Sequence, residues 1–266
     1  KNLKYDIALR GSSFDRDFIM GLIPPGTLPP EIRLPEKNYI RGTLKGSIDN
    51  FVADLQLGGS YGLVTVKGFL KNAKDKENAT YDLLVTTNNY EIGKLISQDS
   101  ILGKVTGTFK AKGTGFNYKT MRSDIIASVK QMEYNKYNYK NAEITAKLNS
   151  GLIDSKGTID DANLKLQYDI KANVKNEYPS VNGLVRVDTA RLQALNIYED
   201  TLNFSLTANI QANSLRPRNL DINTVIDSIQ LQLDNGFYKL DTVSLIASSA
   251  NGRDSINFNA PFASLQ

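Results

Sequence analysis

Apolar and polar residues alternate along much of this chain. In the stretch from 164 to 175, aliphatic and aromatic residues stand at every second position, separated by lysine, glutamine, aspartate and asparagine. A period of two predicts a β-strand with one half-buried face and one face in water. The pattern recurs, and the apolar positions expected on one face are Val105, Phe109, Ile144, Leu148, Leu164, Leu166, Tyr168, Ile170, Leu206, Ile210, Leu231, Leu233, Val243, Leu245, Ile256 and Phe258.

Short turn signals separate many of these stretches. Each signal is only two or three residues long, so it predicts a tight turn between two strands. The signals are Gly58-Gly59, Asn149-Ser150-Gly151, Asp160-Asp161, Asp234-Asn235-Gly236 and Asn251-Gly252. Short links between strands indicate antiparallel pairing. Only residues 90–97 and 189–196 show the three-residue Ile/Leu spacing of a helix, so we expect short helices or helical turns there.

A repeat of about one hundred residues relates the two halves of the pattern. YDLLV at 81–85 parallels VNGLV at 181–185, a short helical stretch follows each, and QMEYNKYNYKNAEITA at 131–146 resembles QLQLDNGFYKLDTVSL at 230–245. We therefore divide the chain into a β segment at 1–79, with a proline-rich crossing stretch at 22–35, and repeat units at 80–180 and 181–266. All three belong to one continuous domain. The expected fold is all-β, mostly antiparallel, with a few short helices.

Composition removes most familiar catalytic chemistry. The chain has no Cys, His or Trp, which excludes thiolate and imidazole ligands, Cys nucleophiles and every His-dependent triad. Its 32 basic and 28 acidic residues are scattered, whereas nucleic-acid binding needs clustered positive charge. We expect no enzyme, no cofactor, no metal site and no nucleic-acid partner.

Several residue groups admit two readings, and in each case we favour the simpler one. Asp160-Asp161 and Asp15 with Asp17 are interpreted as turn acids rather than calcium ligands. Glycines in the GKVTGTFKAKGTG stretch lie inside a predicted strand and indicate a close neighbour rather than a phosphate loop. Three tyrosines, Tyr134, Tyr137 and Tyr139, flank a predicted turn. We expect them to cover the sheet edge or anchor cross-strand packing rather than to form a stacking platform for sugars or bases.

Four stretches of the sequence together resemble the AsmA-like family, in particular its TamB branch in the Bacteroidetes. They are LIPPGTLPPEIRLP followed by YIRGTLKGSI, the GKVTGTFKAKGTG strand, the EYNKYNYKNAEI hairpin and the closing GTIDDANLKL. The resemblance implies an elongated sheet rolled into a taco-like trough with an apolar interior. It further implies that the apolar positions line a groove for phospholipid acyl chains. The implied location is the periplasm, within an envelope-spanning protein that carries lipid toward the outer membrane or supports outer-membrane protein assembly.

The same resemblance implies two further partners. One is an outer-membrane barrel of the TamA type, and the other is the inner membrane, reached through an anchor outside this segment. Asp-Ser and Asp-Thr followed by an aliphatic residue or Ala resemble the O-glycosylation sequon of exported Bacteroidetes proteins. The acceptors would be Ser100, Thr189, Thr201, Ser228, Thr242 and Ser255, although the dipeptides are also ordinary turn chemistry.

Two other architectures stay open at this point. A structural or adhesive β-repeat with a closed dry core fits the alternation equally well, because alternation does not say what covers the apolar face. Stacked repeats favour the trough, since they add units along one axis without a natural point of closure. A transmembrane β-barrel fragment is disfavoured, because the polar face is heavily charged and paired aromatic girdles are missing from the sequence.

Overall fold

The computed structural model describes residues 4–22, 30–250, 253–261 and 263–265. These residues form two compact units, the first comprising Lys1–Asn117 and Ser123–Ala142 and the second comprising Tyr118–Arg122 and Glu143–Gln266. Strands make up most of both. This confirms the prediction of an all-β, mostly antiparallel chain with few short helices.

Strand β8 (Tyr137–Asn149) contributes residues to both units. The other elements of the first unit are β1 (Lys4–Asp15), α1 (Arg16–Leu22), β2 (Lys37–Ser47), β3 (Asn50–Gly59), β4 (Gly62–Lys71), β5 (Thr80–Glu91), α2 (Ile92–Leu95), β6 (Leu102–Thr114) and β7 (Arg122–Tyr134). Those of the second unit are β9 (Leu152–Asp160), β10 (Leu164–Asn173), β11 (Ser180–Arg191), β12 (Leu202–Arg216), β13 (Asn219–Leu233), β14 (Gly236–Leu240), β15 (Val243–Ala250), β16 (Arg253–Ala260) and β17 (Ala263–Leu265).

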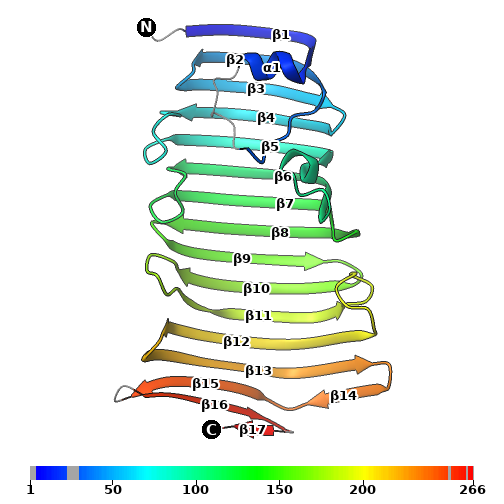
Figure 1. The fold of residues 1–266 in the computed structure, drawn as a ribbon, viewed down its shortest axis with the longest axis vertical. Helices are drawn as coiled ribbons and strands as arrows, with labels where there is room; N and C mark the ends of the chain where they lie inside the picture. Colours follow the sequence, from blue (N-terminus) through cyan, green and yellow to red (C-terminus); the bar gives the residue numbers. More distant parts are fainter. Residues whose placement is uncertain (1–3, 23–29, 251–252, 262, 266) are drawn as a thin grey trace. The chain divides into compact units, whose positions relative to one another are not determined.

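Within each unit, strands that follow one another in the chain lie side by side (Figure 1). In the first unit, β1 to β6 pair antiparallel in chain order. In the second, β9 to β13 do the same, and β13 then pairs with both β14 and β15. A break at Asp241-Thr242 separates β14 from β15, and both pair with β13.

Tight turns link the strands where the sequence indicated them. Ser60 and Tyr61 join β3 to β4, Ser150 and Gly151 join β8 to β9, and Asn135 and Lys136 join β7 to β8. Both residues of the last turn have positive φ, a combination typical of the two-residue turns that match strand twist. The predicted turn at Asn251-Gly252 lies outside the described residues.

Helical structure occurs at both sites where it was expected. Residues 92–95 form α2, with the Ile96 amide donating to the Ile92 carbonyl at 3.1 Å. One repeat later, the Leu195 amide donates to the Arg191 carbonyl, also at 3.1 Å, although residues 192–196 form turns rather than an assigned helix. The next residues match as well, since Ser97 and Asn196 both have φ of 58°.

The strands on either side of these turns repeat too. Thr80 begins β5 and Leu102 begins β6, while Ser180 begins β11 and Leu202 begins β12. In both copies a register shift interrupts the ladder just before the helical turn, between Thr87 and Tyr90 and between Val187 and Ala190. The repeat seen in the sequence is therefore present in the backbone, including its irregular positions.

The predicted proline-rich crossing stretch, 22–35, lies partly outside the described residues, which omit 23–29. Residues 30–36 form no strand, as expected of a proline-rich crossing segment. They are held at α2, where the Arg33 amide donates to the Leu95 carbonyl at 2.7 Å and the Ser97 hydroxyl donates to the Glu31 carbonyl at 2.6 Å. The segment therefore joins the start of the chain to the end of β5.

Candidate functional site: uncharged apolar sheet faces

Strand register defines the two faces of the first unit. Residues directly opposite each other in an antiparallel pair project to the same side of the sheet. One complete row, from β1 to β6, is Leu9, Gly42, Leu55, Val66, Val85 and Phe109. The adjacent row on the same side is Ile7, Leu44, Ala53, Gly68, Leu83 and Ala111. We call this side of β1 to β6 the first apolar face.

The first apolar face carries no charged residue at any registered position of β1 to β6. Its remaining members are Tyr5, Ser12, Phe14, Asn38, Ile40, Gly46, Phe51, Leu57, Gly59, Gly62, Val64, Leu70, Tyr81, Thr87, Tyr90, Val105, Gly107 and Gly113. A charge on such a surface would lose its hydration against neighbouring apolar groups, at a cost of several kcal/mol. The face is thus chemically suited to hydrocarbon across six strands.

A second apolar face is built in the same way on β9 to β16. Its rows include Tyr168, Val185 and Ala208, and also Leu166, Val187 and Leu206. Further along, Thr224 pairs with Leu245 and Leu245 with Phe258. Asp254 is the one charged residue among the registered positions of this face, and it lies near the β15–β16 turn, where it accepts a hydrogen bond from Ser249.

Most of the predicted lining residues fall on these two faces. Val105 and Phe109 belong to the first apolar face. Those on the second are Leu164, Leu166, Tyr168, Ile170, Leu206, Ile210, Leu231, Leu233, Val243, Leu245, Ile256 and Phe258. Ile144 and Leu148, on β8, are half-buried and alternate with exposed Glu143, Thr145 and Lys147.

Sequence reasoning named few of the residues on β1 to β5. Leu44, Leu55, Val66 and Val85 were not among the predicted lining positions, although register places them in line with Phe109 or beside it. Glycines at 42, 46 and 68 interrupt the apolar alternation of their strands, so a pattern of side-chain hydropathy is weakest there. Alternation of β2, with Ile40 and Leu44 between exposed Tyr39, Arg41 and Lys45, was the available signal.

Both apolar faces leave large side chains accessible. Ile7 is 41% exposed on the first, while Leu245 is 37% and Ile256 50% exposed on the second. Among the described residues, Leu195 is the one large side chain with less than 2% exposure. Helix α1 reaches the first face through Phe18, whose ring stacks on Phe14 with centroids 5.3 Å apart, and Phe18 itself is 54% exposed. The apolar groups therefore pack mainly on their neighbours in the same sheet.

Buried apolar side chains of the first unit form a cluster around Tyr90. Tyr90, Val105 and Val129 are each below 10% exposure and pack with Ile92, Leu95, Phe109 and Met132. Burial, with a smaller contribution from the charge of Tyr61, raises the pKa of the Tyr90 hydroxyl above its ordinary value of 10.0. This cluster fixes α2 against the end of β5 and β6.

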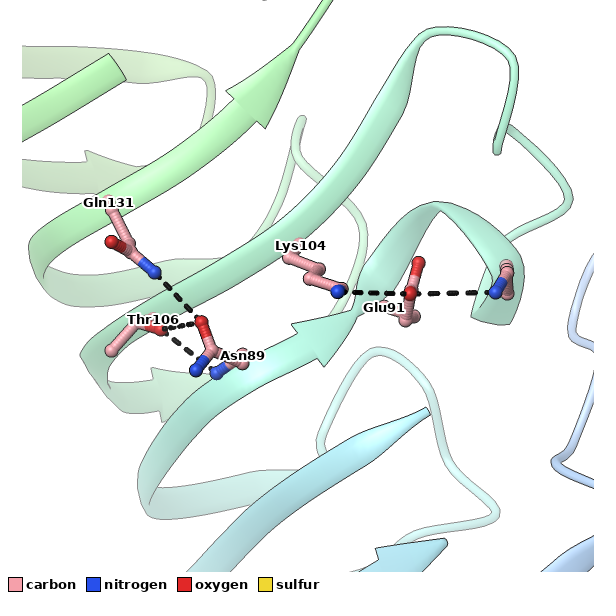
Figure 2. Close-up of polar contacts among 6 residues, drawn as sticks. Asn89, Glu91, Lys104, Thr106 and Gln131 are labelled. Atoms are coloured by element: carbon pink, nitrogen blue, oxygen red, sulfur yellow. Dashed lines mark hydrogen bonds and ion pairs between the residues drawn. The ribbon is translucent and has the colours of Figure 1, made fainter. Parts of the chain in front are cut away.

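Polar side chains next to this cluster hold the irregular end of β5 (Figure 2). Asn89, which has φ of 47°, accepts a hydrogen bond from the Gln131 amide at 2.8 Å, and its backbone N–H donates to the Thr106 hydroxyl at 2.9 Å. Glu91 lies 3.5 Å from the ammonium of Lys94 and 3.8 Å from that of Lys104. These contacts join β5, β6 and β7 at the register shift.

The opposite face of each unit carries the charged side chains, which form ion pairs across strands, together with some exposed apolar ones such as Val52 and Leu184. Lys45 pairs with Asp6 at 3.2 Å, Lys67 with Asp54 at 3.2 Å, and Lys112 with Asp82 at 3.4 Å, each across two neighbouring strands. In the second unit Lys156 pairs with Asp169 at 2.7 Å, which raises the pKa of Lys156. Exposed pairs of this kind contribute little to stability, so their main effect is to keep this side in water.

The remaining sequence candidates lie in turns and strands. Asp161 is 3% exposed and accepts the Asn163 amide at 2.9 Å, as a turn acid does, and Asp160 pairs with Lys165. Tyr137 and Tyr139 contact each other edge to face at 4.8 Å. Of the six candidate glycosylation acceptors, Ser100, Ser228, Thr242 and Ser255 are exposed, whereas Thr189 and Thr201 are half-buried.

Comparison with known proteins finds no family model, curated protein or solved structure that matches the chain. Within the described ranges, neither helix has the length and apolar character needed to cross a membrane.

Proposed function

We propose that this chain is a non-enzymatic lipid-carrying segment whose apolar faces hold the acyl chains of phospholipids. The observation that carries the proposal is the first apolar face, where six consecutive strands present apolar or uncharged residues at every registered position. Large exposed apolar surfaces of this kind mark ligand or partner sites. Because the face has no charged group, it suits the hydrocarbon part of a lipid and leaves the head group at its margin or in water.

Open packing also suits transport better than storage. Fully burying a methylene group contributes about 0.8 kcal/mol, so complete enclosure of a long acyl chain would hold it tightly. A chain lying on an open sheet contacts protein on one side only, and its gain per methylene is smaller. The rows from Leu9 to Phe109 and from Ile7 to Ala111 offer similar neighbouring positions, between which an acyl chain can move without a large barrier.

The proposed setting is the periplasm, within an envelope-bridging protein of the AsmA-like type. In this setting the sheet is rolled into a trough, phospholipid moves toward the outer membrane, and an outer-membrane barrel of the TamA type is the partner at the far end. An anchor outside this segment holds the protein in the inner membrane. The motif resemblance and the two apolar faces support this setting.

Surface burial argues against the closed-core alternative. A structural β-repeat with a dry core would bury its large aliphatic residues, yet Ile7, Leu245 and Ile256 are exposed. These exposed side chains fit a sheet whose apolar side is available to a ligand.

Phospholipid binding tests the proposal directly. We expect the purified chain to bind a fluorescent-acyl phosphatidylethanolamine, and Leu55→Arg to weaken that binding at least about tenfold because it places a charge in the central row of the first apolar face. Gln56→Arg is the matched control, since Gln56 is the next residue in β3 and projects to the polar face. Equal binding by both variants, with both folded, would contradict the proposal.

A further inference from the structure

The polar side of the second unit contains a hollow that the lipid proposal does not use. It has a volume of about 730 Å³ and lies between the β10–β11 connection and the hairpin of β12 and β13. This size falls within the range of about 300–1,000 Å³ typical of small-molecule sites. Most such sites are lined by apolar groups, but this one is lined by polar side chains, which include Asn173, Asn176, Asn213, Asn219, Tyr178 and Arg216.

The chemistry of these side chains selects a class of ligand. Each asparagine amide offers two N–H donors and one carbonyl acceptor, and the hydroxyls of Ser180 and Ser214 both donate and accept. Such groups match a ligand whose own groups also donate and accept, as sugar hydroxyls do. Tyr178 is 39% exposed and presents an aromatic ring with a polar tip at the same hollow, a surface on which a sugar ring can stack.

Local hydrogen bonds position part of this lining. The Asn213 side-chain amide donates to Asp221 at 3.0 Å, and the Asn219 amide donates to the Ser214 hydroxyl at 3.3 Å. Both bonds use the amide nitrogen, so the amide oxygens still have acceptor capacity for a ligand. The hairpin side of the hollow is therefore held in place before any ligand arrives.

Charges of both signs line the hollow. Arg216 and Glu177 belong to the same lining, and the adjoining hollow described next carries Lys147, Lys171 and Asp154. A polyanion such as a nucleic acid would need a cluster of cations without interspersed acids. The interspersed acids disfavour a polyanion, and the donor and acceptor groups of the asparagines favour a neutral ligand.

An adjoining hollow of about 460 Å³ shares Asn173 and Ser180 with the first and extends across β9 and β10 toward Asn182 and Lys171. This second hollow also has apolar lining, at Leu152, Ile153 and Ala172. Two adjoining hollows that share lining residues accommodate a chain of sugar residues better than a single small molecule. We propose that the polar side of the second unit binds a neutral oligosaccharide, with Tyr178 as the stacking residue and the asparagines as hydrogen-bonding residues. The site lies on the face opposite the second apolar face, so lipid and glycan would bind independently.

The test uses the 266-residue chain and three neutral hexasaccharides, of β-1,4-linked N-acetylglucosamine, β-1,4-linked glucose and α-1,4-linked glucose, as probes. We expect saturation-transfer NMR to show binding of at least one of them, and Tyr178→Ala to weaken that binding at least about tenfold by titration calorimetry. Gln211→Ala is the matched control, because Gln211 is exposed on the same polar side of β12 but does not line the hollow. Asn176→Ala, in the exposed connection, provides a second variant if Tyr178→Ala does not fold.

Two results would overturn the proposal. One is that none of the three hexasaccharides receives saturation from the folded protein. The other is that Tyr178→Ala and Asn176→Ala bind the active hexasaccharide as tightly as Gln211→Ala does. Binding of fluorescent phosphatidylethanolamine, measured on the same variants, should stay unchanged, which separates loss of this site from failure of the lipid proposal.

Discussion

Tyr90 links burial of a single hydroxyl to the stability of the first unit. Because burial raises its pKa in the folded state, the folded chain holds this proton more tightly than the unfolded chain does. The effect of Tyr90 on the free energy of unfolding is therefore constant below its ordinary pKa of 10.0. As pH rises from there through the raised pKa of the folded state, the free energy of unfolding falls. Tyr90→Phe should make this fall shallower, as measured by urea unfolding at a series of alkaline pH values. An unchanged pH dependence in Tyr90→Phe would show that another group is responsible.

Gly68 shows why glycine stands on an otherwise aliphatic face. Its φ is 139°, and a Cβ atom there would meet the backbone of Asp82 and Leu83 on the neighbouring strand. Gly68→Ala should lower the free energy of unfolding by about 1–3 kcal/mol because of backbone strain, with further loss from the clash. At Gly58, a Cβ would meet only ordinary contacts, the nearest at 3.7 Å from Leu63 Cδ1. Gly58→Ala is the control, and equal losses at both positions in thermal unfolding would refute the explanation.

Side-chain alternation predicted which residues share a face, and it did so well in the second unit. Leu166, Tyr168 and Ile170 alternate without interruption over β10, so a period of two was enough to place them. It could not locate the register shifts, for example between Arg10 and Ser12 in β1. One extra residue in a strand inverts the phase locally and leaves no trace in composition.

At the scale of elements, the end of β5 depends on Asn89. Its positive φ is tolerated better by asparagine than by most residues, and its contacts with Thr106 and Gln131 tie three strands together. Asn89→Ala should lower the free energy of unfolding by about 1–2 kcal/mol, from lost hydrogen bonding and left-handed backbone strain. Asn88→Ala, at the exposed preceding residue, should change it by less than about 0.5 kcal/mol. Similar values from chemical denaturation of both variants would contradict this role.

The two helical turns were predictable in position but not in type. Spacing of Ile and Leu indicated both, and the hydrogen bonds at Ile96 and Leu195 are equivalent. In the first copy the Pro-rich segment binds at Leu95 and Ser97, contacts that come from residues more than sixty positions away. Partners so distant in the sequence cannot be deduced from local spacing.

At the scale of the whole molecule, a ladder of strands paired in chain order explains both the regular fold and the exposed apolar side. Each strand forms its backbone hydrogen bonds with its neighbours in sequence, so the ladders of both units form without a second sheet packed against them among the described residues. The sequence predicted this ladder through its short turns. It could not predict whether the apolar side is covered, because alternation is the same for an open face and a closed core.

Photocrosslinking tests the central claim most directly. Photoreactive residues are introduced at Leu166 and Leu231, on the second apolar face, and at Lys165 and Gln167, on the polar side of β10. Each protein is mixed with phospholipid vesicles and irradiated, and lipid attachment is measured by mass spectrometry. The account predicts attachment at Leu166 and Leu231 and little at Lys165 and Gln167. Equal attachment on both sides, or none on either in the folded protein, would contradict it.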